Sequence, residues 1–297
     1  MSTLLKIHYA GLDADKHMLD LRAFGEAALG LDKLANTGLI ALSDQRVPRK
    51  GERFPMRIVA QEPEEGSFEW VVYLAPFTAV ALPIVHEMFY TKAAEFLWHW
   101  ISWVTSMVGG RQKDADPHLQ VILEMSKDVH KSHAESEQRT KDFMLEVLDK
   151  MKSPAKNFVA PVGESADKVS LIADSTEEPL LLTHQIDVPM ADAIRSKDKL
   201  EVGDMERMRL RIDGLIHHNR QLKVEHPDQP GKFITANVRD PAFSEEGNVY
   251  TDAVAQKGIL EVSAKPSRTS DGELKTLYIL DASGVVDPDA ETGPRDG

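Results

Sequence analysis

Residues 206–214 read ERMRLRIDG, and residues 207–212 within them alternate strictly between basic and apolar side chains. The apolar set is Met208, Leu210 and Ile212, and the basic set is Arg207, Arg209 and Arg211. A period of two places successive side chains on opposite faces of a β-strand, so this stretch predicts a strand with one buried and one exposed face. It decides the fold class of the C-terminal half, because the segments around it repeat the pattern.

Four more strands and one short helix are predicted around this segment. The strands are RQLKVEH (220–226), FITANVR (233–239), GILEVSAK (258–265) and LKTLYILD (274–281). The helix is predicted over residues 250–256, between FITANVR and GILEVSAK. The resulting order β-β-β-α-β-β matches the OB-fold, a five-stranded Greek-key barrel. We therefore predict a small C-terminal β-barrel with OB-like element order.

The N-terminal half contains a predicted strand and a predicted β-hairpin. Leu5, Ile7 and Tyr9 alternate with polar neighbours, as in a half-buried strand. FPMRIVAQ (54–61) and SFEWVVYL (67–74) flank a short acidic turn, which is typical of a hairpin. Together with the helices below, these strands predict the fold class α+β.

Two amphipathic helices are predicted in the same half. Asp20 is placed to cap a helix that runs to about Asn36, and Gly38 is predicted to end it. Asp116 and its neighbouring proline predict the start of a long helix over residues 118–151. The centre of that helix is polar on all sides, which predicts an exposed arm or a bridge between packed regions.

Domain boundaries follow from these elements and from the charge pattern. We predict an α+β and helical domain over residues 1–160 and the barrel domain over residues 161–281. The barrel domain then includes the apolar segments DKVSLIA (167–173) and EPLLLTHQI (178–186). Residues 282–297 are acidic and rich in Gly, Pro and Asp, so they predict a disordered tail.

Residues 95–110, EFLWHWISWVTSMVGG, hold three of the four tryptophans of the chain. On a helical wheel, Trp100 and Trp103 fall on a wide apolar arc, whereas Trp98 falls among the polar positions. The run is shorter than the roughly 20 apolar residues that a membrane-spanning helix needs. We therefore favour a core or oligomer-interface helix over a membrane-inserted hairpin, with Trp98 exposed and meeting a partner alongside Trp103.

The composition limits the class of protein. The formal net charge of −13 argues against a general nucleic-acid coat and against binding to anionic membranes, since both need a basic surface. The chain has no cysteine, which excludes disulfides, thiolate nucleophiles and cysteine metal sites and fits a reducing compartment. The N-terminus lacks a basic segment followed by an apolar core, so no secretory signal is predicted. These features predict a cytoplasmic protein.

A basic face with one aromatic ring is the main candidate for ligand binding. Its predicted residues are Arg207, Arg209, Arg211, Lys223, Phe233 and Arg239. Cations that follow a phosphate backbone, with a ring on which a base stacks, are the general means of binding single-stranded nucleic acid. The opposing interpretation is that arginines fill the solvent face of a half-exposed sheet.

Three groups of histidine and carboxylate residues are candidate metal ligands. They are Asp13, Asp15 and His17; His130, His133 and Glu137; and the pair His217 and His218. None is completed to a known calcium or zinc motif, so a solvated turn, a polar helix face and a loop are the favoured interpretations. The nucleophile-elbow, P-loop and dinucleotide-binding motifs are also absent from the sequence. We predict no catalytic residue, no metal and no cofactor, and lean toward a protein that is not an enzyme.

Several segments resemble an uncharacterised bacterial protein family. They are GLDADKH (11–17), EPEEGSFE (62–69), NFVAPVG (157–163), MRLRIDGLIHHNRQLKVE (208–225) and DPAF (240–243). The resemblance covers most of the chain and implies an N-terminal α+β region and a C-terminal five-stranded barrel. It implies no catalytic residue.

These observations favour a non-enzymatic assembly or sensor protein. Its apolar helical region would mediate self-association or docking of a partner protein, and its barrel would recognise a ligand or a protein. The first alternative is a single-stranded nucleic-acid or nucleotide binder that uses the arginine face. The second is a membrane-associated effector, although the composition does not favour a membrane partner.

Overall fold

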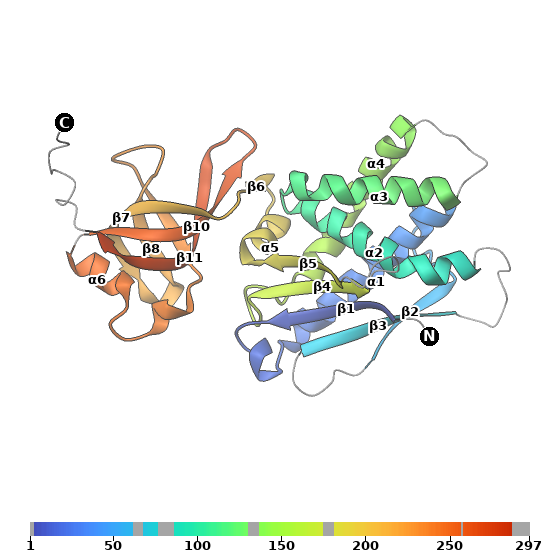
Figure 1. Ribbon diagram of the computed structural model, residues 1–297, viewed down its shortest axis with the longest axis horizontal. Helices are drawn as coiled ribbons and strands as arrows, with labels where there is room; N and C mark the ends of the chain where they lie inside the picture. Colours follow the sequence, from blue (N-terminus) through green and yellow to red (C-terminus); the bar gives the residue numbers. More distant parts are fainter. Residues whose placement is uncertain are drawn as a thin grey trace. The chain divides into compact units, whose positions relative to one another are not determined.

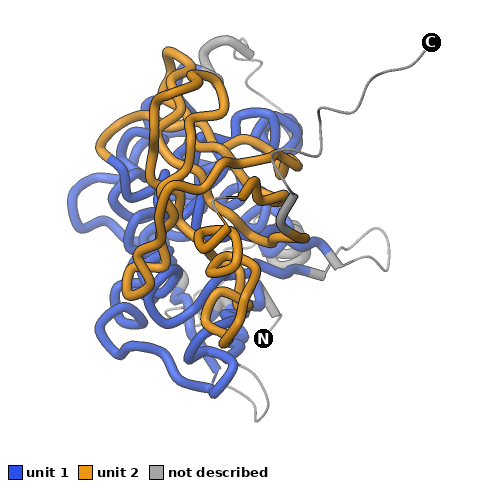
Figure 2. Tube along the Cα trace, turned by 90° about the vertical axis from the view of Figure 1, so that its left-hand side faces the viewer, with its two compact units in different colours: residues 1–196 blue, residues 197–297 orange. Residues whose placement is uncertain are grey.

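The computed structural model describes residues 3–61, 68–76, 86–129, 137–174, 181–256 and 258–286. The chain divides into two units, residues 1–196 and residues 197–297 (Figure 2). This boundary differs from the one predicted at residue 160. The difference arises because the two apolar segments assigned to the barrel belong to the N-terminal sheet.

The N-terminal unit is built on one antiparallel sheet with the strand order β2-β3-β1-β4-β5. Its strands are β1 (Thr3–Ala10), β2 (Met56–Ala60), β3 (Phe68–Pro76), β4 (Lys168–Asp174) and β5 (Leu181–Asp187). The predicted first strand and the predicted hairpin are confirmed. β4 pairs with the central strand β1, and Ile7 lies opposite Leu171. The sequence of a strand does not specify which strand it pairs with in a sheet. The sequence therefore predicts β4 and β5 as part of the barrel domain, although they pair in the N-terminal sheet.

Helices pack on this sheet and bury one of its faces (Figure 1). They are α1 (Leu21–Asp44), α2 (His86–Val108), α3 (Gln112–Val129), α4 (Glu137–Phe158) and α5 (Val188–Arg195). The buried sheet residues include Leu5, Ile7, Tyr9, Trp70, Val72, Val169 and Leu171. Of the long helix predicted over residues 118–151, the structure describes two helical stretches, which belong to α3 and α4. The link between them, residues 130–136, lies outside the described residues and contains His130 and His133.

Helix α2 carries the tryptophans and is packed in the core. Trp98, Trp100 and Trp103 are all buried, and α2 contacts α1, α3, β1 and β4. The indole Nε1 of Trp98 donates a hydrogen bond to the carbonyl oxygen of Leu171 at 3.0 Å. The prediction of an exposed Trp98 is therefore wrong. Within the described residues, no helix is long and apolar enough to cross a membrane.

The polar side of α2 is also buried, which explains the error. Thr105 lies on the polar arc, yet it is buried and its hydroxyl donates to the carbonyl oxygen of Ile101 at 2.7 Å. A short hydroxyl side chain that bonds to its own helix backbone can be buried without a large penalty. Polarity on the helical wheel therefore does not mark the solvent face of this helix.

Two glycines allow other helices to approach α1 closely. A Cβ at Gly38 would lie 2.6 Å from Cδ1 of Trp100, and one at Gly30 would lie 2.4 Å from the backbone nitrogen of Phe158 on α4. Gly38 does not end α1 as predicted. The helix continues to Asp44, and Gly38 instead provides space for the indole of Trp100. The indole Nε1 also donates to the carbonyl oxygen of Leu34 at 2.9 Å.

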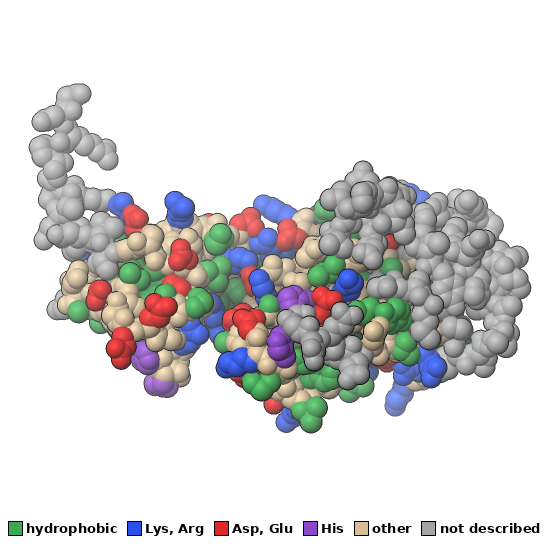
Figure 3. Space-filling view, turned by 60° about the horizontal axis from the view of Figure 1, so that its bottom comes forward, with side chains coloured by type: hydrophobic (Ala, Val, Ile, Leu, Met, Phe, Trp, Pro, Cys, Tyr) green, Lys and Arg blue, Asp and Glu red, His purple; other side chains and the backbone are tan. Residues whose placement is uncertain are grey.

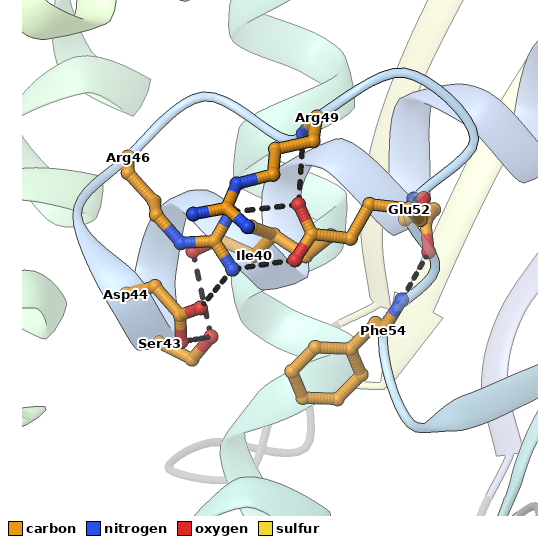
Figure 4. A network of polar contacts seen from close by, with 8 residues as sticks. Ile40, Ser43, Asp44, Arg46, Arg49, Glu52 and Phe54 are labelled. Carbon is orange, nitrogen blue, oxygen red and sulfur yellow. Dashed lines mark hydrogen bonds and ion pairs between the residues drawn. The ribbon is translucent and has the colours of Figure 1, made fainter.

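The segment after α1 is held by an ion-pair network (Figure 4). The guanidinium of Arg46 donates to both carboxylate oxygens of Glu52, at 2.7 and 2.6 Å, and to Asp44 at 2.7 Å. Glu52 also accepts a hydrogen bond from the backbone nitrogen of Arg49 at 2.7 Å. The hydrogen bond from Arg46 contributes most to lowering the pKa of Glu52 to about 2, and the backbone hydrogen bond from Arg49 lowers it further. The network therefore fixes the path of the chain from α1 to β2.

The C-terminal unit is a closed β-barrel of five strands, to which the short β6 (Leu200–Val202) is added. The strands are β7 (Glu206–Ile216), β8 (Gln221–Glu225), β9 (Phe233–Val238), β10 (Ile259–Thr269) and β11 (Leu274–Val286). They pair in the order β7-β8-β9-β11-β10 and return to β7, and β9 and β11 are parallel. Helix α6 (Val249–Gln256) lies between β9 and β10 in the chain (Figure 1). The predicted barrel and its OB-like element order are confirmed.

The end of the barrel changes one prediction about the tail. Residues 282–286 belong to β11, whereas the prediction placed them in the disordered tail. The remainder of that tail, residues 287–297, lies outside the described residues.

Gly30 and Gly25 give a matched pair of substitutions on α1. Gly30→Ala should lower the free energy of unfolding by about 1–3 kcal/mol, because the methyl group would collide with the backbone of α4. Gly25→Ala should raise it by about 0.5–1 kcal/mol, because no atom lies within 4 Å of the added Cβ and alanine favours the helix. Urea unfolding of both variants measures the two changes. Equal effects would contradict the close packing of α1 against α4.

Candidate functional site

The outer face of β8 and β9 is an uncovered strand surface on the barrel. Gly214, Lys223 and Thr235 are paired in register across β7, β8 and β9. A bulge in β7 between Ile212 and Gly214 adds Asp213 as an extra residue, and Asp213 is exposed. Because bulges turn side chains in a new direction, the bulge explains how a carboxylate comes to lie beside β8.

Lys223 and Phe233 meet on this face. The Lys223 ammonium lies 5.2 Å from the centre of the Phe233 ring, a cation–π distance. The same ammonium pairs with the carboxylate of Asp213 at 2.6 Å. Phe233 remains 39% exposed. The ring and its two charged neighbours form the centre of the candidate site.

Polar side chains continue the face toward the start of β8. The amide of Gln221 donates to the side-chain oxygen of Asn237 at 3.2 Å. Arg239 is the first residue after β9, and its Nε is buried without a hydrogen-bond partner among the described residues. Ile216 is exposed at the end of β7. The face therefore offers one ring, one aliphatic side chain and several hydrogen-bonding groups.

A stacked cluster fixes the turn between β7 and β8. Arg220 has a left-handed backbone with φ of 53°, and its guanidinium lies 5.9 Å from the centre of the Phe243 ring. The His217 ring stacks on Phe243 at 5.6 Å. Behind this ring, Tyr250 donates to the buried Asp240 at 2.6 Å, and burial together with this carboxylate raises the pKa of Tyr250. The turn is thus anchored to the barrel core, so β8 starts from a fixed position.

The structure brings two of the six residues predicted for ligand binding together at this face, and their role in binding stays a prediction. Lys223 and Phe233 are brought together, and Arg239 lies one residue beyond β9. Arg207, Arg209 and Arg211 lie on the part of β7 that pairs with β10. Arg209 is paired with Glu261 on β10 at 2.9 Å. The two predicted partner-interface residues, Trp98 and Trp103, are buried in the other unit and contribute to no surface there.

A cluster of three histidines was not found from the sequence. His99 on α2 and His118 on α3 lie with their Nδ1 atoms 3.0 Å apart, and Trp98 packs edge-on against both rings. His184 on β5 lies 3.0 Å from the Thr105 hydroxyl through its Nε2. These residues come from distant positions in the chain, so no local motif could indicate them.

The cluster is kept neutral by its surroundings. Burial and the neighbouring His118 lower the pKa of His99 to about 4. Burial likewise lowers the pKa of His184 to about 4, against the opposing effect of Asp114. Among the described residues, no group of three or more His, Cys, Asp or Glu residues could hold a metal ion. We therefore interpret the cluster as part of the α2–α3–β5 packing.

Comparisons with known proteins identify two family models along the chain. A model described as "Domain of unknown function (DUF7946)" matches residues 5–195. A second, described as "Family of unknown function (DUF7947)", matches residues 204–283. No curated protein and no solved structure matches the chain. The two matched ranges coincide closely with the two structural units.

The histidine cluster predicts a loss of stability in acid. The unfolded chain protonates these histidines near pH 6.5, while the folded chain keeps His99 and His184 neutral down to about pH 4. Their contribution to stability is therefore complete above pH 6.5 and is lost as the pH falls toward 4.

Urea unfolding at about pH 7 and about pH 4.5 measures this loss. His99→Gln should make the loss smaller, because one of the depressed histidines is removed. His218→Gln, at an exposed turn residue, is the control and should leave it unchanged. A loss that is the same in both variants would show that the cluster does not control acid stability.

Proposed function

The chain belongs to the family of the DUF7946 domain, and we propose that it is a non-enzymatic binding protein whose barrel recognises an extended segment of a partner protein. The binding surface is the outer face of β8 and β9. The observation that carries the proposal is the exposed Phe233 ring beside Lys223 on an uncovered strand pair. Exposed aromatic residues supported by polar neighbours are the usual anchors of protein interfaces.

The charges of the face favour a protein over a polyanion. Lys223 is paired with Asp213, and Glu225 lies on the same strand pair, opposite Phe233. A phosphate backbone would have to displace Asp213 from Lys223 and pass the carboxylate of Glu225. A polypeptide segment needs no such change, because it can pair with both signs of charge and place an apolar side chain on Phe233.

The shape of the face suits an extended chain. Gly214 leaves open space beside Lys223, since the only atom within 4 Å of a Cβ built there is Cβ of Lys223, at 4.0 Å. The opposite side of Lys223 is occupied by the short side chain of Thr235. Small residues, Gly214 and Thr235, therefore flank Lys223, and this row lies between Phe233 and the Gln221–Asn237 pair.

A second candidate ligand is single-stranded nucleic acid. The specific observation in its favour is the combination of an aromatic ring and a cation on strands two and three of an OB-like barrel, the face that binds oligonucleotides in such folds. Arg207 and Arg211 are exposed on the adjoining strand and would supply further positive charge.

Panning a displayed library of random peptides on the full chain tests the protein-binding proposal. Selected peptides should bind Phe233→Ala about tenfold more weakly, because the anchor ring is lost. Gly214→Leu should weaken binding similarly by filling the open space beside Lys223, and Gly214 does not have the positive φ that would strain another residue. Leu145→Ala removes a more exposed hydrophobic side chain from α4 and should change nothing.

A labelled single-stranded oligonucleotide distinguishes the two ligands. Fluorescence anisotropy at low salt should detect no binding if the partner is a protein. Binding that weakens steeply with added salt and is lost in Phe233→Ala would favour the nucleic-acid candidate. The proposal fails if neither peptide nor oligonucleotide binding depends on Phe233.

A further inference from the structure

Exposed hydrophobic side chains are concentrated at the start of α1. Within the described residues, half of the large exposed hydrophobic side chains lie between residues 12 and 29. They are Leu12, Met18, Leu21 and Leu29. In Figure 3, hydrophobic side chains gather on the lower part of the N-terminal unit, where the β1–α1 loop lies in Figure 1. Scattered exposed leucines are ordinary, whereas a group on one helix face and its loop indicates a surface for association.

The helix face has a symmetric pattern. Leu21 and Leu29 are 83% and 59% exposed, and Gly25 lies midway between them. No atom lies within 4 Å of a Cβ built at Gly25, so the space there is open. Residues four apart neighbour each other along a helix face. The face therefore presents two apolar side chains on either side of a gap.

The surface is preformed by its loop. The backbone nitrogen of Ala14 donates to the carbonyl oxygen of Ser165 at 2.9 Å, and the nitrogen of Gly11 donates to the carboxylate of Asp15 at 2.7 Å. Asp20 caps α1 by accepting from the nitrogen of Ala23 at 2.8 Å. Leu12 is held at φ of 52°, a conformation that is costly for a bulky residue, while its side chain is exposed. These bonds fix the start of α1 before any partner binds.

We propose that this α1 face binds the same face of a second copy of the chain, with a two-fold axis through Gly25. In an antiparallel pair of helices related in this way, Leu21 of one copy lies at the level of Leu29 of the other. The two glycines face each other and let the helix axes approach closely. A surface that matches itself under a two-fold rotation is what an isologous dimer requires.

The charges beside this stripe are complementary under the same rotation. Arg22 and Glu26 lie on one side of the stripe and pair with each other at 3.2 Å in the single chain. Under the rotation, Arg22 of one copy lies about two residues, or roughly 3 Å of helix rise, from the level of Glu26 of the other. Two equivalent ion pairs can therefore form across the axis. A partner surface that carries only one sign of charge could pair with Arg22 or with Glu26 but not with both, which is why a second copy fits better.

Sedimentation equilibrium of the full chain over a range of concentrations tests the dimer. Gly25→Gln fills the gap and should raise the dimer dissociation constant by about tenfold or more, while urea unfolding at concentrations where the chain is monomeric should show a fold that is at least as stable. Leu145→Gln, at a leucine of similar exposure on α4, is the matched control and should leave the dissociation constant unchanged.

Exchange of the two charges tests the two-fold arrangement itself. Arg22→Glu should weaken the dimer by about tenfold, because it places two carboxylates opposite each other on both sides of the axis. The double variant Arg22→Glu with Glu26→Arg should restore the dissociation constant to within about threefold of the original. The proposal is overturned if the chain is monomeric at every concentration. It is also overturned if Gly25→Gln leaves the dimer dissociation constant unchanged. Failure of the double variant to restore association also overturns it.

Discussion

The N-terminal unit depends on the contact between Trp100 and α1. The indole fills the space beside Gly38 that a Cβ would occupy, and its nitrogen donates to the carbonyl oxygen of Leu34. This contact sets α2 close against α1 and places the other side of α2 against β4, where Trp98 bonds to Leu171. A larger residue at position 38 would separate α1 from α2 and expose the tryptophans, so one glycine limits the packing of the unit.

Burial of α2 changes where binding surfaces can lie. A tryptophan-rich helix is a natural candidate for an interface, yet its indoles already have partners inside the chain. Exposed apolar side chains are instead found in groups on the β1–α1 loop and the first turns of α1, and at Ile216 and Phe233 on the barrel, with Leu145 and Met205 elsewhere. The two proposals rest on these separate surfaces, and each can fail without the other.

Three cations of the barrel are neutralised by carboxylates, which bears on the choice of ligand. Lys223, Arg209 and Arg268 each pair with a carboxylate, at 2.6, 2.9 and 2.8 Å. Exposed pairs of this kind contribute little to stability. They matter more for recognition, because a ligand must replace a carboxylate to use the cation and a mixed-charge surface therefore discriminates against uniform polyanions.

The sequence by itself determined the local elements: the period of two in ERMRLRIDG, the order β-β-β-α-β-β, and the meeting of Lys223 with Phe233 on adjacent strands. These follow from alternation and turn chemistry, which act between near neighbours in the chain. Only the tertiary structure decided that β4 pairs with β1, that Trp98 is buried, and that His99, His118 and His184 converge. Strand partners, burial on all sides of a helix, and clusters from distant segments depend on non-local packing, which no local pattern encodes.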